Sequence, residues 1–233
     1  MIVESIYGQD CDLPSQGGTE SLYTHSLEMQ EGAKSPQGFV ELAGALQAKW
    51  AIANIDGKKE AIMFPAGSVP TVETVNKGFE AAFDCSDCSI AGSVPWTIAE
   101  LGSPITQKAQ TAMLKYPQAN LMMSGVGPVA EYTAPAIVNT GKTDTILNTG
   151  SSASPQNLEL IRDDRGQSMA VATDGRWFGY AATDDVVRLF NDETPVFSGF
   201  SAGIVDTENP YAGEEFHSPV DYVSNYRKLW GVN

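Results

Sequence analysis

The strongest constraint on the fold is a regular alternation of short apolar runs with helical patterns along most of the chain. Residues 61–64 (Ala-Ile-Met-Phe) form a run typical of a fully buried strand, and residues 72–83 then carry apolar side chains at helical spacing. The same order repeats up to about Asn191. This alternation favours an α/β fold, with doubly wound parallel sheets that have helices on both faces. The 233 residues are enough for two lobes of this kind.

The pentapeptide Ala-Gly-Ser-Val-Pro occurs twice, at 66–70 and at 91–95, each time directly after a short apolar run. The offset of 91 − 66 = 25 residues is about the length of one strand plus one helix. If both copies follow parallel strands, they lie side by side at the edge of the sheet where α/β proteins bind their ligands. We therefore expect ligand contacts from Ser68 and Val69, and from Trp96 after the second copy. For Trp96, packing in the core is the alternative.

Two further strand ends carry side chains that suit a binding site. Ser124 ends a predicted strand, where a hydroxyl could contact a ligand or cap a helix. Thr173 and Asp174 follow another predicted strand, and Trp177 comes soon after them. The Trp177 ring could stack on a bound molecule, although core packing is again the alternative.

Neither a catalytic site nor a cofactor site is well supported by the sequence. Residues 125–130 match the dinucleotide-binding pattern G-x-G-x-x-A, with Asp144 about 20 residues further on. However, Pro128 removes a backbone donor at the helix start that would hold the pyrophosphate, so a tight turn is the favoured interpretation. No G-x-S-x-G surrounds any serine, and neither His25 nor His217 lies at a predicted strand end. We therefore expect no enzyme activity, no cofactor and no metal site.

The charge balance argues against nucleic acid as a partner. The chain has 14 basic and 29 acidic residues, a net charge of −15, so its mean field repels a phosphate backbone. No stretch approaches the roughly 20 apolar residues of a membrane span. Residues 1–7 are predicted to form a strand rather than a signal peptide, because no basic region precedes a long apolar run.

The three cysteines are Cys11, Cys85 and Cys88. A Cys-x-x-Cys pair can be a structural disulfide, a redox site or half of a zinc site. The redox site needs a helix after the pair, whereas here a helical pattern ends before Cys85 and a strand follows Cys88. Zinc would need two more ligands from Cys11, His25 and His217. We favour a Cys85–Cys88 disulfide, which would indicate an extracytoplasmic protein, and keep free thiols and zinc as alternatives.

Several segments together resemble the type I periplasmic binding proteins, the sugar-type substrate-binding subunits of ABC transporters. These segments are Gly-Ala-Leu-Gln-Ala at 44–48 before Asp-Gly-Lys at 56–58, Lys-Gly-Phe-Glu-Ala-Ala-Phe at 77–83, Gly-Tyr-Ala-Ala-Thr-Asp at 179–184, and the ending at 221–232. The resemblance covers nearly the whole chain and rests on the order and spacing of the segments. It implies an extracytoplasmic solute-binding protein of an ABC importer, with the transporter permease as its partner and no catalysis.

In that family two doubly wound lobes, joined by three crossings, close on a ligand in the cleft between them. Mapped onto this chain, residues 33–174 and 201–233 form a complete C-terminal lobe. Residues 1–32 and 175–200 form a partial N-terminal lobe, which lacks the strands with which the family begins. The resemblance therefore implies that this chain is shorter than a full family member.

The resemblance also implies further binding residues. The acidic residue after the fourth strand of the first lobe falls at Asp10 or Asp12, for which a solvated turn is the alternative. Strand ends that carry hydrogen-bonding side chains in sugar binders fall at Val126, Gly150 and Ser151. Because small or apolar residues stand there, we expect a small organic ligand, sugar-like or less polar, rather than a simple hexose.

Two other functions stay open. The effector-binding domain of a transcriptional regulator has the same fold, and a helix-turn-helix in the parent reading frame would favour it. A nucleotide-dependent α/β enzyme would use the turn at 125–130, and it would be excluded if no nucleotide shifted the melting temperature.

Overall fold

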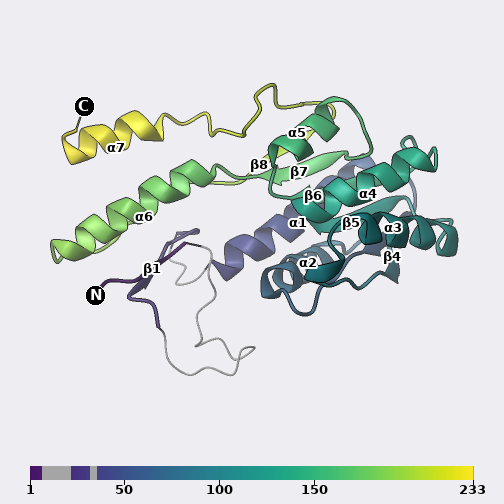
Figure 1. Ribbon diagram of the computed structural model, residues 1–233, viewed down its shortest axis with the longest axis horizontal. Helices are drawn as coiled ribbons and strands as arrows, with labels where there is room; N and C mark the ends of the chain where they lie inside the picture. Colours follow the sequence, from purple (N-terminus) through teal and green to yellow (C-terminus); the bar gives the residue numbers. More distant parts are fainter. Residues whose placement is uncertain (7–21, 32–35, 233) are drawn as a thin grey trace. The chain divides into compact units, whose positions relative to one another are not determined.

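The computed structural model describes residues 1–6, 22–31 and 36–232, and its contacts divide the chain into two compact units (Figure 1). Unit 1 comprises residues 1–39, 174–201 and 217–233, and unit 2 comprises residues 40–173 and 202–216. Asp10, Cys11 and Asp12 lie outside the described residues, so the predictions made for them stay predictions.

Strands and helices alternate along the chain from α1 to α6, as the sequence pattern predicts. The elements are β1 (Glu4–Ser5), β2 (His25–Ser26), α1 (Gln37–Asn54), β3 (Lys59–Met63), α2 (Pro70–Ala82), β4 (Cys88–Ser93), the 3-10 helix η2 (Ile98–Glu100), α3 (Ser103–Lys115), β5 (Leu121–Val126), α4 (Gly127–Asn139), β6 (Leu147–Ser151), α5 (Pro155–Arg162), β7 (Met169–Ala172), α6 (Gly175–Phe190), β8 (Gly203–Asp206) and α7 (Tyr222–Trp230).

Unit 2 is built on a six-stranded sheet with the order β4-β3-β5-β6-β7-β8 (Figure 1). The strands from β4 to β7 pair in parallel, and β8 runs antiparallel to β7. Successive side chains of the central strands face opposite sides of the sheet. Ile62 and Met122 pack against α3 and α4, whereas Met63 and Met123 pack against α1 and α2. The predicted α/β fold, with helices on both faces of a parallel sheet, is confirmed for this unit.

Unit 1 combines the parallel pair of β1 and β2 with the helices α6 and α7. Aromatic stacking joins the two helices: the rings of Trp177 and Tyr222 lie 5.2 Å apart, and those of Tyr180 and Trp230 lie 5.6 Å apart. The sequence-based division placed residues 217–233 in the C-terminal lobe. The contacts place them in unit 1 instead, because α7 buries its aromatic face on α6.

The start of α1 also belongs to unit 1, although the sequence-based division grouped residues 33–174 together. The Phe39 ring meets the rings of Phe178 and Phe200 edge-on, at centroid distances of 6.2 and 6.0 Å. Edge-to-face aromatic contacts of this kind stabilise a core beyond the area they bury. Because of this cluster, the first residues of α1, up to Phe39, belong to unit 1, and the rest of the helix belongs to unit 2.

A disulfide joins Cys85 to Cys88 in the connection between α2 and β4, as predicted. The two Cα atoms lie 5.0 Å apart, and the Cys88 amide donates to the Cys85 carbonyl. Closing so short a loop restricts the unfolded chain only modestly, by about 2 kcal/mol in the chain-entropy model.

We expect the double substitution Cys85→Ser and Cys88→Ser to lower the free energy of unfolding by about 2 kcal/mol, measured by urea denaturation without a reductant. The wild-type protein in reductant is the matched control, because it loses the bridge and keeps both side chains in place. Equal stability of the oxidised and reduced wild-type protein would contradict this expectation.

Candidate functional site

The two Ala-Gly-Ser-Val-Pro segments lie side by side at the carboxyl edge of the sheet in unit 2. The first follows β3 and the second ends β4, the strand that pairs with β3 in parallel. The Val94 amide donates to the Met63 carbonyl at 2.8 Å, and the Trp96 amide donates to the Pro65 carbonyl at 3.0 Å. The predicted juxtaposition of the two segments is therefore confirmed.

The first segment turns the chain directly into α2. The Val69 amide donates to the Ala66 carbonyl at 2.7 Å, and Pro70 occupies the start of the helix, where its missing amide hydrogen costs nothing. The Glu73 carboxylate accepts a hydrogen bond from the Ala66 amide at 3.1 Å, which fixes the turn. Ser68 is exposed and Val69 is half-buried, so both are available at this edge.

The strand order reverses beside β3, since the chain continues from β3 to β4 on one side while β5 pairs with β3 on the other. Open α/β sheets bind ligands at such a reversal, outside the carboxyl ends of the strands. Gly125 lies near the end of β5, where the register with β6 shifts, and has φ +76°, a conformation that favours glycine. The Gly125 carbonyl accepts hydrogen bonds from Gln47 Nε2 at 3.1 Å and from Ser151 Oγ at 2.8 Å. These bonds fix the ends of β5 and β6 relative to each other.

Three of the predicted binding residues of unit 2 lie in the core. Ser124 is fully buried, and its Oγ lies 2.7 Å from Asn148 Oδ1. Gly150 is buried where an added Cβ would come within 3.1 Å of Ala130 Cβ. Trp96 is 6% exposed, and its Nε1 donates to the Phe64 carbonyl at 3.0 Å. The structure thus gives Trp96 the packing role that was the alternative in the sequence analysis.

Asp174 and Trp177 belong to unit 1, where both are buried. Asp174 caps α6 by accepting from the Arg176 amide at 3.1 Å, and its other oxygen accepts from the Ser218 amide at 2.9 Å. The Tyr222 hydroxyl also donates to Asp174, at 3.2 Å. Burial, and then the neighbouring Asp174 charge, raise the pKa of Tyr222 to about 12. These contacts make Asp174 and the stacked Trp177 part of the packing between α6 and α7.

The predicted residues that are accessible at the carboxyl edge come from the ends of four strands. They are Ser68, Val69, Val126, Ser151 and Thr173, each exposed or half-buried. None of the five side chains is charged. This part of the edge therefore offers hydroxyl groups and small apolar surfaces, which suit a neutral molecule with both polar and apolar parts.

Sequence reasoning missed two buried amides next to this edge. Gln47 is fully buried in α1 and accepts from Thr149 Oγ1 at 3.0 Å while it donates to Gly125. Asn76 in α2 is 5% exposed, and neither its Oδ1 nor its Nδ2 has a hydrogen-bond partner among the described residues. In the sequence, each is a polar residue on an otherwise apolar helix face. Such residues are common, so this pattern alone does not indicate a functional site.

No model of a known protein family matches the sequence, and no curated protein matches it either. Solved structures do match. GanP, a glucose-galactose binding protein from Geobacillus stearothermophilus, aligns with a TM-score of 0.69 at 14% identity, over 90% of this chain and 69% of that one. A solute-binding protein of an Agrobacterium vitis ABC transporter, with bound D-fucose, gives a TM-score of 0.69 at 14% identity, over 92% of this chain and 69% of that one.

A carbohydrate transporter solute-binding protein from Agrobacterium radiobacter, in complex with D-arabinose, gives a TM-score of 0.70 at 12% identity, over 89% of this chain and 67% of that one. The chain has the fold of these sugar-transporter solute-binding proteins. The resemblance to type I periplasmic binding proteins is thus confirmed at the level of the fold. The chain spans about two thirds of the length of these structures. Among the residues that the structure describes, no helix is both long and apolar enough to cross a membrane.

Proposed function

We propose that this chain is a solute-binding protein of an ABC importer and binds a small organic ligand at the carboxyl edge of the sheet in unit 2. The observation that carries the proposal is the match in fold, over about nine tenths of the chain, to solute-binding proteins that hold D-fucose and D-arabinose. The position of the twin pentapeptide segments beside the reversal of strand order supports the same edge.

The chemistry of the accessible edge favours a ligand that is sugar-like or less polar than a simple hexose. The hydroxyl groups of Ser68 and Thr173 can each donate and accept a hydrogen bond, and the Ser151 hydroxyl, which already donates to the Gly125 carbonyl, can still accept one. Val69 and Val126 add apolar surface at two neighbouring strand ends, where a ring or methyl group gains free energy by leaving water. A fully hydroxylated hexose would leave some of its own polar groups unpaired against these valines.

The remaining parts of the proposal follow from the same class of protein. A binding protein of this kind releases its ligand unchanged, so we propose no catalysis, and its partner is the permease of the transporter. The Cys85–Cys88 bridge supports an extracytoplasmic location, because such bridges persist in oxidising compartments.

A thermal-shift screen of hexoses against deoxy sugars and alkyl glycosides tests the proposal. We expect a less polar compound, at about 100 times its Kd, to stabilise the protein by about 2.7 kcal/mol. For a chain of this size that corresponds to a rise in Tm of about 5–10 °C. Chromatography of the recovered compound should show that it is unchanged.

A matched pair of variants locates the binding site. Ser68→Trp adds bulk at the exposed carboxyl edge, and we expect it to weaken binding at least about tenfold, by 1.4 kcal/mol or more. Ser86→Trp adds the same bulk in the exposed turn before β4, at the opposite edge, and should leave the affinity unchanged. An equal loss of affinity in both variants would overturn the proposed site. Selective stabilisation by a hexose would overturn the proposed ligand class.

A further inference from the structure

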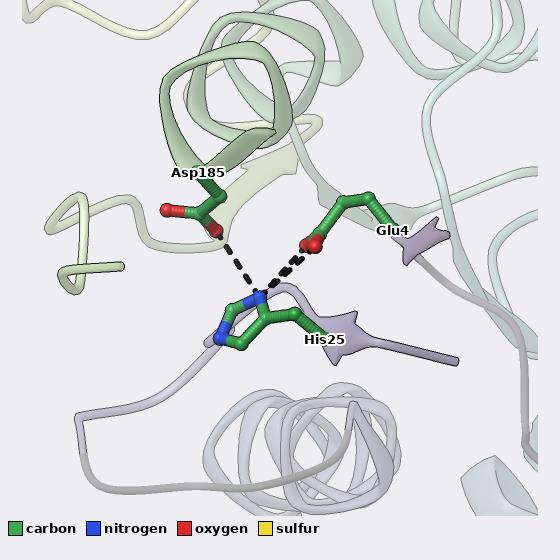
Figure 2. Close-up of side chains that lie close together, drawn as sticks. All are labelled: Glu4, His25 and Asp185. Carbon is green, nitrogen blue, oxygen red and sulfur yellow. Dashed lines mark hydrogen bonds and ion pairs between the residues drawn. The ribbon is translucent and has the colours of Figure 1, made fainter. Parts of the chain in front are cut away.

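Two carboxylate side chains of unit 1, those of Glu4 and Asp185, converge on Nδ1 of His25 (Figure 2). Glu4 of β1 lies opposite His25 of β2 in the strand register, and its two carboxylate oxygens lie 3.1 and 3.0 Å from Nδ1. Asp185 of α6 approaches from another direction, with Oδ2 at 3.7 Å from the same nitrogen. The other ring nitrogen of His25 points away from both carboxylates (Figure 2).

The two carboxylates of the cluster are buried, and the described residues place no lysine or arginine in an ion pair with either of them. Asp185 is 2% exposed, and its Oδ2, which faces the imidazole, has no hydrogen-bond partner among the residues that the structure describes. The Glu4 side chain is 7% exposed. The nearby Arg188 guanidinium is held by Asp184 at 2.7 Å, and within the described part of the chain no lysine or arginine pairs with Glu4 or Asp185.

Two buried carboxylates beside one imidazole lower the stability of the folded state unless a cation or a proton is bound between them. Burial, followed by the charge of Glu4, raises the pKa of Asp185 to about 6, while the His25 charge opposes the shift. Burial also raises the pKa of Glu4. For Glu4 the hydrogen bond and the charge of His25 oppose the shift, and for Asp185 the Arg188 charge opposes it too, so burial is the main cause of both shifts.

We propose that Glu4, His25 and Asp185 bind a divalent transition-metal cation of the zinc class. Zinc takes imidazole nitrogen and carboxylate oxygen at about 2.0–2.2 Å, and tetrahedral geometry then keeps its ligand atoms about 3.4 Å apart. The distances of 3.0 and 3.7 Å from Nδ1 bracket that separation, and the three ligand atoms all lie within 4.8 Å of one another. Small side-chain shifts complete the site, and a water molecule fills the fourth position.

The choice of metal follows from the ligands. An imidazole nitrogen with two carboxylates suits zinc and its first-row neighbours, whereas magnesium and calcium prefer all-oxygen sites. The bound cation would join β1, β2 and α6, which are far apart in the sequence, so its role is to stabilise unit 1. This metal site departs from the sequence-based expectation of none.

Calorimetric titration of the chelator-treated full chain with zinc chloride, without reductant so that the disulfide stays closed, tests the proposal. We expect one zinc ion per chain and a zinc-dependent rise in Tm. His25→Asn keeps an amide near the Nδ1 position but removes the metal-binding nitrogen, and it should weaken zinc binding at least about 100-fold. His217→Asn is the matched control at the other histidine, and it should bind zinc as the wild-type chain does.

Asp185→Asn separates metal binding from a purely structural role. It removes one of two facing carboxylates without changing the side-chain size, so the metal-free variant should be at least as stable as the wild-type chain. It should nevertheless lose the zinc-dependent rise in Tm. The proposal is overturned if zinc does not bind, if binding survives in His25→Asn and Asp185→Asn, if it is lost in His217→Asn, or if magnesium binds equally well.

Discussion

Replacing Gly44 by alanine should strongly destabilise unit 2. In α1, a Cβ at position 44 would lie 1.9 Å from the Val75 carbonyl oxygen and 2.7 Å from the Phe79 amide nitrogen of α2. The reciprocal position is equally tight, since a Cβ on Gly78 would lie 2.0 Å from the Glu41 carbonyl oxygen. In both cases the added Cβ clashes with backbone atoms of a helix, and no change of side-chain rotamer can relieve such a clash. The two helices must separate, which breaks the core between them and the sheet.

We expect Gly44→Ala to lower the free energy of unfolding by about 3 kcal/mol or more, at the upper end of what overpacking costs. Urea denaturation followed by circular dichroism measures it. Gly179→Ala is the matched control: Gly179 also lies within a helix, α6, but apart from its chain neighbours and its own helix backbone no described residue has an atom within 4 Å of the added Cβ. There the gain in helix propensity should stabilise the protein by up to about 1 kcal/mol. A similar effect of both substitutions would contradict the close helix contact.

The sequence predicted those features that local patterns specify. The apolar run at 61–64 marked β3, and the helical spacing over 72–83 marked α2, each within a few residues of its observed bounds. The repeated pentapeptide predicted neighbouring loops, because parallel strands joined by one helix often pair directly. The disulfide was predicted because a helical pattern ends before Cys85 and a strand follows Cys88, which does not suit a redox site, and because zinc would need two more ligands.

Features that depend on long-range packing were not predictable in the same way. β8 lies in a stretch rich in turn residues, and its four residues show no clear alternation. The spacing of Val223, Tyr226 and Trp230 is typical of a helix, but no local pattern identifies α6 as the partner of α7. Glu4 and Asp185 are 185 − 4 = 181 positions apart, so no motif spacing could link them. The burial of Ser124 likewise follows from its partners on α4 and β6 rather than from its position at a strand end.

The polar network that contains Ser124 leads to the second large expected effect, that of Asn148→Asp. Asn148 is fully buried in β6, and its Oδ1 accepts from Ser124 Oγ at 2.7 Å, while its Nδ2 donates to the Gly166 carbonyl at 3.0 Å. An aspartate there would place a carboxylate oxygen against that carbonyl oxygen. No lysine or arginine among the described residues pairs with this position. An uncompensated buried charge of this kind costs about 3–5 kcal/mol.

The pH dependence distinguishes the buried charge from a simple loss of packing. Burial should raise the pKa of the introduced carboxyl in the folded state above its unfolded value of about 3.9, so the folded form binds the proton more tightly. The stability lost in Asn148→Asp, relative to the wild-type chain, should therefore be largest at neutral pH and shrink as the pH falls toward that unfolded value. Asn54→Asp, at the exposed end of α1, is the matched control and should change stability by less than about 1 kcal/mol at any of these pH values. A deficit in Asn148→Asp that stays constant with pH would show that the network tolerates the charge and that shape alone is disturbed.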